Sequence, residues 1–414
     1  MGPPVTMLAP LLGSESVSWR LNCTDVPYFG SGLDAGATPL SLAAAAAHGM
    51  PLFRHMFGAD PCARVIRGKL WLYVSHDPSV PHKTQLRSDA ARDGATDMSI
   101  TNFEVFSASS PEAPLLSHGV ALSLSDVPWA SKVIWAPDVV AGRNGKVYLY
   151  FPAIDKYGDF RVGVAIAEKP EGPFRAEPAP VEGTFSIDPH VFVSSAGVSS
   201  LYFGGLWGGQ LEKWKAPSHE KFTDGRALGP QRARLSDDFL SLASEVREMS
   251  IRDDVGIPIN ASDTSRRFFE ATWLFERNDL VYLVYSTGDT HLLVYATATN
   301  SEGPFTYRGQ LLPPVLGWST HPAVVQFGEH WWLIFQDATL SGGATERRNL
   351  KVARLTFTSD GSMAVEQSVR SRCQPETANW ASTSGESSNR VRHSTSTPRT
   401  GIRSQRRSVL SPDA

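Results

Sequence analysis

GKLWLYVSHD, at residues 68–77, is the stretch that decides the fold, because the chain repeats its pattern four more times. Each copy is rich in Tyr, Trp, Val, Leu and Phe and is bounded by Gly, Asn or Asp, which is the composition of a β-strand between turns. A short unit that recurs along a chain is the signature of a repeat architecture. The later copies are GKVYLYFPAID (145–155), SSLYFGGLWGG (199–209), DLVYLVYSTGD (279–289) and EHWWLIFQDA (329–338).

A second apolar strand comes shortly before every copy, so each repeat is predicted to be a β-hairpin. The first strand of each hairpin opens on a polar or ionisable residue. Two further stretches, VGVAIAEKPEGPF (162–174) and LLVYATATNSEGPF (292–305), are similar to one another and indicate a third strand and an outer turn in two repeats. The five preceding strands are DPCARVI, APDVVAG, DPHVFVSS, EATWLFER and HPAVVQFG.

Five units of three or four antiparallel strands, with almost no helical periodicity, predict an all-β chain folded as a five-bladed β-propeller. A β-sandwich is the alternative fold. The innermost strand of every propeller blade lines the central channel, and its entrance end faces one common funnel. The residues that open these strands are therefore expected at equivalent places and close together in space. They are Asp60, Asp138, Asp188, Glu270 and His321.

Two flanking regions lie outside the repeats. Residues 1–48 contain Gly, Pro and an Ala run and are predicted to form an irregular N-terminal extension. Residues 49–370 are predicted to form the propeller. Residues 371–414 are rich in Ser, Thr and Arg and poor in apolar residues, which predicts a disordered tail.

Composition narrows the classes of partner. The 414 residues are 41% hydrophobic and carry a net charge of only -3, and no long basic stretch lies among the repeats. This argues against nucleic acid or an anionic membrane as the main partner and favours a neutral substrate. No run reaches the roughly 18 apolar residues of a membrane span. The N-terminus lacks the charged and apolar regions of a clear signal peptide, and the compartment and the oligomeric state stay open.

The three cysteines, Cys23, Cys62 and Cys373, are widely spread and show neither a disulfide nor a zinc-ligand spacing. They are expected to be buried or incidental thiols.

Acids gathered in such a funnel suit the hydrolysis of a glycosidic bond. One carboxyl group must stay protonated to protonate the leaving oxygen, and a second must stay ionised to activate water or to attack the sugar. Crowding of like charges and partial burial raise the pKa of one group, while hydrogen bonds keep another ionised. By spacing alone, Asp138 and Asp188 are equal candidates to join Asp60 and Glu270.

Aromatic residues lie beside the proposed funnel residues. A sugar ring presents an apolar C–H face that stacks on an indole or phenyl ring, although each of these residues could equally belong to the hydrophobic core. They are Trp135, Trp207, Trp273 and Phe269.

Five longer motifs carry a resemblance to a known family. They are GADPCARVIRGKLWLYVSHD, VALSLSDVPWASKVIWAPDVV, SIDPHVFV, RRFFEATWLFERNDLVYLVYSTGDTHLL and GWSTHPAVVQF. Over roughly residues 50–365 the chain resembles glycoside hydrolase family 43, the inverting β-xylosidases and α-L-arabinofuranosidases with a five-bladed propeller.

The resemblance implies a role for each acid. Asp60, in Ala-Asp-Pro, corresponds to the general base, and Glu270, in Phe-Glu-Ala, to the general acid. Asp188, in Ile-Asp-Pro, corresponds to the acid that tunes the pKa and the orientation of the general acid. The family motif thus selects Asp188, and Asp138 and Trp135 are assigned to substrate contact or site architecture.

The resemblance also suggests residues around the acids. Arg348, in Glu-Arg-Arg-Asn, resembles an arginine that reaches the subsite for the terminal sugar. Trp207 and Phe269 are candidate substrate contacts through their place beside the funnel residues and not through the resemblance. His321 resembles the residue at the channel centre where some members bind calcium or a water cluster. No cofactor is required, and a structural calcium ion in the central channel is compatible with the resemblance. The departures from the family pattern are Cys62, Pro322 and Gln336, none of which removes an acid.

The expected activity is removal of terminal xylose or arabinofuranose from hemicellulose-type polysaccharides or oligosaccharides, with inversion. Inversion requires the carboxyl groups of Asp60 and Glu270 to lie about 6.5–9.5 Å apart, whereas about 5–5.5 Å would indicate retention. Three alternatives are an endo-arabinanase, a non-catalytic carbohydrate-binding propeller and a propeller scaffold for protein partners. The choice between xylose and arabinose depends on pocket shape and is left open.

Overall fold

The computed structural model describes residues 49–78, 99–206, 208–215, 225–287, 292–317 and 320–366. All of them fall in one compact unit, Met1–Val369. The residues that flank this range, including those of the expected N-terminal extension and tail, lie outside the described residues, so both of those expectations stay predictions.

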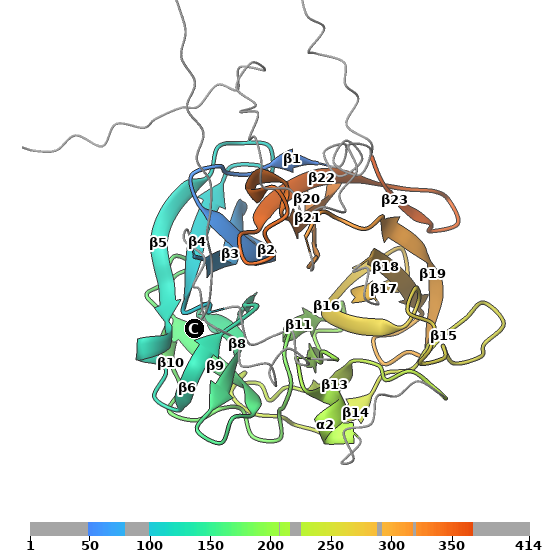
Figure 1. Ribbon diagram of the computed structural model, residues 1–414, viewed down its shortest axis with the longest axis horizontal. Helices are drawn as coiled ribbons and strands as arrows, with labels where there is room; N and C mark the ends of the chain where they lie inside the picture. Colours follow the sequence, from blue (N-terminus) through green and yellow to red (C-terminus); the bar gives the residue numbers. More distant parts are fainter. Residues whose placement is uncertain are drawn as a thin grey trace, which may run out of the picture. The chain divides into compact units, whose positions relative to one another are not determined.

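The described strands form five sheets arranged in a ring (Figure 1). Contacts between innermost strands run from β2 to β7, β11, β16 and β20 and back to β2, which closes the ring. The predicted five-bladed β-propeller is therefore confirmed. Each predicted hairpin supplies the innermost strand of one blade and the strand beside it. Adjacent strands within a blade are antiparallel except where β15 meets β19.

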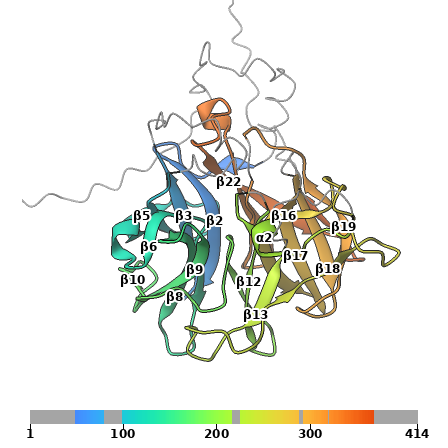
Figure 2. The ribbon, with the colours of Figure 1, turned by 60° about the horizontal axis from the view of Figure 1, so that its bottom comes forward.

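The strands of each blade run side by side from the ring axis outward (Figure 2). Blade 1 contains β2 (Phe57–Ile66), β3 (Lys69–Asp77), β4 (Asn102–Ala108) and β5 (Leu116–Ser123). Blade 2 contains β6 (Ala130–Ile134), β7 (Asp138–Ala141), β8 (Val147–Asp155), β9 (Phe160–Ala167) and β10 (Arg175–Ala176). Blade 3 contains β11 (His190–Val193), β12 (Ser199–Phe203), β13 (Gln231–Arg234) and β14 (Arg247–Glu248).

Blades 4 and 5 complete the ring. Blade 4 contains β16 (Phe268–Arg277), β17 (Leu280–Thr287), β18 (Leu292–Ala298), β19 (Phe305–Leu312) and, at its outer edge, β15 (Ile251–Arg252). Blade 5 contains β20 (Ala323–Phe327), β21 (His330–Asp337), β22 (Asn349–Phe357), β23 (Met363–Val365) and β1 (Met50–Pro51). The short helix α2 (Leu211–Lys215) follows β12, and two single 3₁₀ turns span Leu124–Asp126 and Thr339–Ser341.

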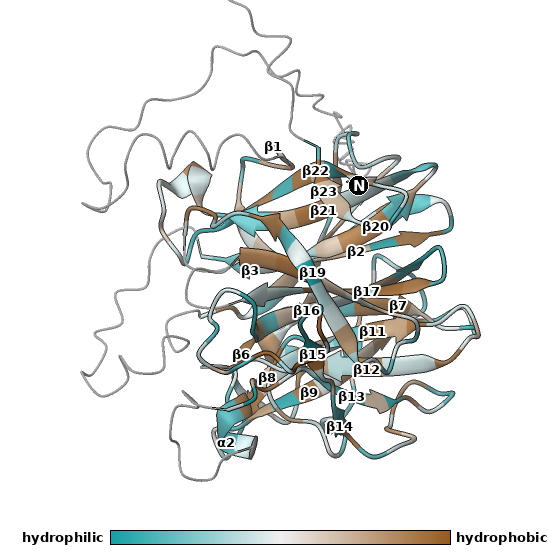
Figure 3. Ribbon diagram, turned by 90° about the vertical axis from the view of Figure 1, so that its right-hand side faces the viewer, coloured by the Kyte–Doolittle hydropathy of each residue, from teal (hydrophilic) through white to brown (hydrophobic). Residues whose placement is uncertain are grey.

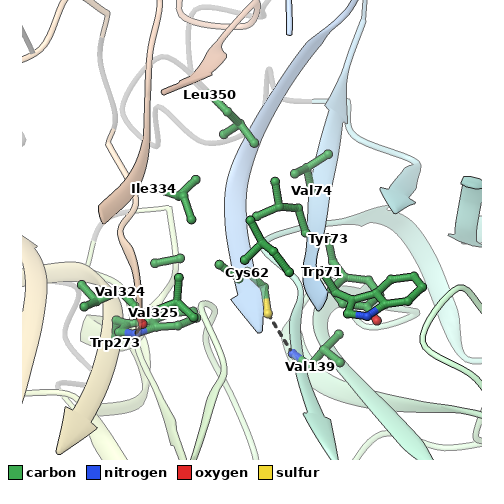
Figure 4. Packing of buried hydrophobic residues seen from close by; sticks show 14 of the residues in the cluster. Cys62, Trp71, Tyr73, Val74, Val139, Trp273, Val324, Val325, Ile334 and Leu350 are labelled. Carbon is green, nitrogen blue, oxygen red and sulfur yellow. Dashed lines mark hydrogen bonds between the residues drawn. The ribbon is translucent and has the colours of Figure 1, made fainter. Parts of the chain in front are cut away.

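The core lies within and between the blades. Hydrophobic residues are concentrated on the strands, and hydrophilic residues gather at the connecting turns (Figure 3). Side chains from neighbouring blades pack together, as the cluster around Cys62, Tyr73, Val324 and Ile334 shows (Figure 4). In the described ranges no helix has the length and apolar character of a membrane span.

Buried tyrosines fasten each of the first four blades to the next. Each lies on the second strand of its blade and donates a hydrogen bond to a carbonyl oxygen in an outer turn of the following blade. A buried phenol needs such a partner, because an unsatisfied hydroxyl costs free energy. The pairs are Tyr73 with Pro170 at 2.7 Å, Tyr150 with Phe239 at 2.5 Å, Tyr202 with Ser301 at 2.8 Å and Tyr282 with Gly361 at 2.8 Å.

The fifth interface is built differently. Strand β1 pairs with β22, with Met50 opposite Val352 and Pro51 opposite Lys351, and the Leu52 N–H donates to the Leu350 carbonyl at 3.0 Å. The start of the described chain thus completes the last blade and joins blade 5 to blade 1.

Candidate active site

The same backbone feature, a non-glycine residue with positive φ followed by proline, lies at or near the start of three inner strands. Asp60, Ala136 and Asp188 have φ values of 52°, 22° and 55° and precede prolines at the openings of blades 1, 2 and 3. This region costs free energy for a residue with a side chain, and such outliers occur where the surrounding structure holds them for function. The backbone of blades 1 and 3 is therefore bent where an acid is presented.

Strand register shows that Asp138 is not equivalent to Asp60 and Asp188. Asp138 pairs with Tyr150, just as Cys62 pairs with Tyr73 and His190 with Tyr202. Asp138 is therefore level with Cys62 and His190, two residues further along the strand than the acids of blades 1 and 3.

The expectation that Asp138 stands at the same place as the other openers is wrong, because blade 2 carries Ala136 there. The repeated proline could have revealed this, since Asp60, Ala136, Asp188 and His321 all directly precede one. We call Asp60, Asp188 and Glu270 the acid tier, and Cys62, Asp138 and His190 the anchor tier.

Glu270 is the third residue of β16, in blade 4. The pairing of β16 with β17 shifts register on both sides of Glu270, and the next residue, Ala271, has a φ of 64°. Bulges of this kind bend a strand and redirect a side chain, and they are common beside active sites. Asp60 has a similar position, since it lies within the register shift between Ala59 and Cys62 in β2.

Asp60 is held by an arginine from blade 5. The Nη1 and Nη2 atoms of Arg348 lie 2.9 Å and 3.5 Å from the two carboxylate oxygens, and the Asp60 backbone N–H donates to the side-chain oxygen of Gln336. Burial alone would raise the pKa of Asp60, but the charge of Arg348, that of the His321 ring once low pH protonates it, and hydrogen bonding from Gln336 lower it below the ordinary value. Asp60 is therefore kept ionised.

The pKa values of Asp188 and Glu270 are shifted in the opposite direction, upward. Burial and the charge of Asp60 raise the pKa of Asp188 to about 8, although the Ala271 N–H donates to Asp188 Oδ2 at 2.7 Å and opposes the shift. Burial and the charges of Asp188 and Asp60 raise the pKa of Glu270 well above its ordinary value. This pair of carboxyl groups therefore keeps a proton near neutral pH.

Arg348 is placed between two aspartates. Its backbone N, Nε and Nη2 donate to Asp77 at 2.8–2.9 Å, while Nη1 binds Asp60, and only 3% of its surface is exposed. The guanidinium therefore holds the base, and the expected reach of Arg348 into the subsite for the terminal sugar stays a prediction.

Asp77 was missed from the sequence as a site residue. It ends the second strand of blade 1, and Asp155 and Asp337 end the corresponding strands of blades 2 and 5. The recurrence of Asp at this strand end was a signal that the position matters, but nothing in the sequence linked Asp77 to Arg348, 271 residues away.

His321 lies beside the base without a cage of metal ligands. Its Nδ1 is 4.0 Å from Asp60 Oδ1, and burial lowers its pKa to about 4, so the ring is neutral at pH 7. Within the described ranges no group of three or more His, Cys, Asp or Glu side chains could hold a metal ion. Calcium takes about six to eight oxygen ligands, which backbone carbonyls and water can also supply, so the expected calcium ion in the channel stays a prediction.

The expected aromatic contacts fall into different places. Trp135 packs on Phe160 with ring centroids 4.8 Å apart and is 8% exposed. Phe269 is wholly buried in a hydrophobic cluster, so its expected role as a sugar contact is corrected to a core role. Trp273 is buried as well, and its Nε1 donates to the Val324 carbonyl at 3.0 Å. Trp207 lies outside the described residues.

Residues 55–363 match the model of the glycosyl hydrolases family 43. The chain is 44% identical to xylosidase/arabinosidase 43A of Humicola insolens, over 77% of this chain and 99% of that protein. It is 43% identical to a xylosidase/arabinosidase of Bacteroides ovatus, over 73% of this chain and 93% of that protein.

Solved structures show the same similarity. A family 43 β-xylosidase/α-arabinofuranosidase from a compost microbial metagenome, in complex with xylotriose and in a calcium-free form, has a TM-score of 0.72 and 44% identity, covering 78% of this chain and 97% of that one. A family 43 enzyme from Xanthomonas citri, complexed with xylotriose, has a TM-score of 0.73 and 42% identity, covering 80% and 97%.

Proposed function

This chain belongs to the glycosyl hydrolases of family 43, and we propose that it removes terminal xylose or arabinofuranose from hemicellulose-type chains with inversion of configuration. Relatives at 43–44% identity bear the names of xylosidases and arabinosidases. Two solved relatives bind xylotriose, which supports a carbohydrate as the substrate.

One observation carries the proposal, the opposite displacement of pKa values within one group of acids. Asp60 has its pKa lowered beside Arg348, while burial and like charge raise the pKa of Glu270. Glycoside hydrolysis by inversion needs one ionised base and one protonated acid at the same pH. A module that only binds sugar has no chemical need for this difference.

The reaction follows from these two protonation states. Glu270 gives its proton to the glycosidic oxygen as the bond to the anomeric carbon breaks, so the leaving sugar departs as a neutral alcohol. Asp60 takes a proton from a water molecule whose oxygen bonds to the anomeric carbon from the opposite face. The products are two free sugars, and the proton that Glu270 gave is replaced by the one that Asp60 gained.

Asp188 and Arg348 support these two groups. Asp188 accepts a hydrogen bond from the backbone of Ala271, the residue after Glu270, and its charge raises the pKa of Glu270. Arg348 keeps Asp60 ionised and oriented through Nη1. No step requires a metal ion, and His321 acts as a neutral neighbour of the base.

The test compares the wild type with Glu270→Ala and Asp60→Ala on 4-nitrophenyl β-xyloside and 4-nitrophenyl α-arabinofuranoside. We expect release of 4-nitrophenol by the wild type and its near abolition in both variants, and NMR should show α-xylose as the first product of the β-xyloside. Sugar binding without cleavage of any aryl glycoside or oligosaccharide would identify a carbohydrate-binding protein. First release of the β-anomer would contradict inversion.

A further inference from the structure

The anchor tier connects the two chain segments that carry Asp60 and Asp188. Asp138 Oδ1 accepts a hydrogen bond from Cys62 Sγ at 3.1 Å, and Cys62 follows Asp60 by two residues. Asp138 Oδ2 accepts from the Val191 N–H at 2.6 Å, and Val191 follows Asp188 by three residues. One carboxylate in blade 2 thus binds the inner strands of blades 1 and 3.

Cys62 strengthens this connection because its sulfur also accepts a hydrogen bond. The Val139 N–H donates to Cys62 Sγ at 3.2 Å (Figure 4). Together with the bond from Cys62 to Asp138, β2 and β7 are therefore joined by two hydrogen bonds in opposite directions. Burial and the charge of Asp138 raise the pKa of Cys62 well above its ordinary value, which keeps the thiol proton that Asp138 accepts.

Arg64 extends the network to the other blades. Its Nη2 lies 2.7 Å and 2.8 Å from the two oxygens of Asp138 and also donates to the Val191 carbonyl at 3.1 Å, while Nε donates to the Val139 carbonyl at 2.6 Å. Its guanidinium carbon lies 4.6 Å from the ring centroid of Trp273 in blade 4. Trp273 in turn donates to Val324 in blade 5, so the inner strands of all five blades are connected.

His190 adds a second connection to blade 4. His190 Nε2 lies 3.0 Å from the backbone nitrogen and 3.2 Å from the carbonyl oxygen of Leu274, and its Nδ1 is 3.6 Å from Asp138 Oδ2. The carboxylate of Asp138 is therefore surrounded by donors and is only 2% exposed. These contacts leave it no free oxygen to present to a sugar.

We propose that Asp138 is a positioning residue for the hydrolysis, whose carboxylate fixes the spacing between Asp60 and Asp188 by binding the strands that carry them. This inference rests on the proposed function for its consequence in catalysis. A displacement of reacting groups by about 1 Å can lower a rate about 100-fold, because the bound geometry no longer approaches the transition state. Asp138 therefore controls turnover without touching the substrate.

The first experiment replaces the carboxylate with an amide of the same shape. In Asp138→Asn we expect kcat for 4-nitrophenyl β-xyloside to fall about 100-fold, with KM within about threefold of the wild type. Glu248→Gln is the matched control, since Glu248 also binds an arginine and a backbone N–H but lies on the outer strand β14 of blade 3. We expect the control to keep the kcat of the wild type.

Each other outcome contradicts the proposal in a specific way. A rise in KM at unchanged kcat would make Asp138 a substrate contact, because uniform binding is then what was lost. A lower melting temperature with unchanged kcat and KM would make it a merely structural residue.

The second experiment uses the neighbouring thiol, where the changes are milder and folding is expected to be retained. Cys62→Ala removes the donor to Asp138 and the acceptor for Val139, and we expect kcat to fall several-fold. Cys62→Ser keeps both hydrogen bonds, and we expect kcat within about twofold of the wild type. Equal kcat in the alanine and serine variants would overturn the proposal even if Asp138→Asn fails to fold.

A third measurement separates this inference from the proposed function. Crystal structures of the wild type and Cys62→Ala should differ in the separation of the Asp60 and Asp188 carboxyl groups, whatever the substrate is. If the wild type cleaves no glycoside, the proposed function fails while this comparison still tests the positioning. Unchanged carboxyl positions in an otherwise ordered variant would overturn the positioning.

Discussion

The acid tier and the anchor tier lie at adjacent levels of the inner strands, but their carboxyl groups differ in the number of hydrogen-bond and charge partners that compensate them. Asp60 is 7% exposed and Asp138 2%, so both carboxyl groups are buried. The acid tier gathers three carboxyl groups around one arginine, which is shared with Asp77. The anchor tier gives one carboxylate its own arginine, a thiol and a backbone N–H.

The comparison shows that burial does not distinguish a reactive acid from a structural one. The distinction lies in how fully hydrogen-bond donors and positive charges compensate the carboxylate. Where like charges crowd with too few partners, pKa values diverge and a proton is retained. Where every oxygen is satisfied, the carboxylate stays paired and ties strands together. Substitutions in the acid tier should therefore remove activity and spare stability, whereas substitutions in the anchor tier should affect both.

The largest expected effect is that of Glu270→Gln. We expect kcat for xylo-oligosaccharides to fall by about 10⁴-fold because the general acid is lost. The free energy of unfolding should not decrease, because a crowded and buried carboxyl group is replaced by a neutral amide. Steady-state kinetics and urea denaturation measure the two quantities, and a large loss of stability would break the distinction between the tiers.

Asp188→Asn should have the next largest effect. We expect a loss of about 10²-fold in kcat together with a shift of the alkaline limb of the pH–rate profile to lower pH. The sign follows from charge, because the negative Asp188 raises the pKa of Glu270 and its removal lets Glu270 lose its proton earlier. A profile of kcat/KM against pH measures this, and an unshifted limb would exclude Asp188 as the residue that tunes the acid.

Arg348→Lys tests the base of the acid tier, Asp60, whose pKa Arg348 lowers. An ammonium group cannot bind Asp60 and Asp77 with the same fork of donors, so the pKa of Asp60 should rise toward its ordinary value. The acid limb of the pH–rate profile should then move to higher pH, because Asp60 becomes protonated earlier as the pH falls. A parallel loss of roughly 3 kcal/mol in the free energy of unfolding is expected for a weakened buried ion pair.

Trp273→Phe should have the smallest effect, because Trp273 lies outside both tiers and is linked to the anchor tier through Arg64. It removes the hydrogen bond to Val324 and weakens the contact with Arg64, which together should lower the free energy of unfolding by about 1–2 kcal/mol. We expect kcat within about threefold of the wild type, since Asp138 keeps both strands. Thermal unfolding and kinetics measure the two effects, and a loss of kcat without a loss of stability would contradict the structural role of Trp273.

The sequence predicts the fold well because propeller strands are local patterns. The five apolar copies correspond to β3, β8, β12, β17 and β21, and alternation, turn residues and repetition all act over about ten residues. Asp60 and Glu270 could be located in the same way, since each opens a first strand beside a recognisable motif.

The interior of the site could not be predicted equally well. Asp138 was placed one level wrong, because the strand register is a property of pairing and the repeated proline was not used to align the blades. Phe269 was expected to contact sugar, yet the strand turns its ring into the core. The partnership of Arg348 with Asp60 and Asp77 spans more than 270 residues and depends on ring closure, which no local pattern encodes.

The interface between blades 5 and 1 links closure of the ring to catalytic activity. The first four interfaces are fastened by tyrosine hydroxyls, but at the fifth Arg348 reaches across the joint to Asp60, 288 residues away in sequence. Contacts between residues so far apart in sequence form late in folding, because the chain loses conformational entropy in bringing the distant segments together before the contacts can stabilise it. A refolding chain should therefore bury its tyrosines and tryptophans before it regains catalytic activity. The return of activity then reports the formation of the interface between blades 5 and 1.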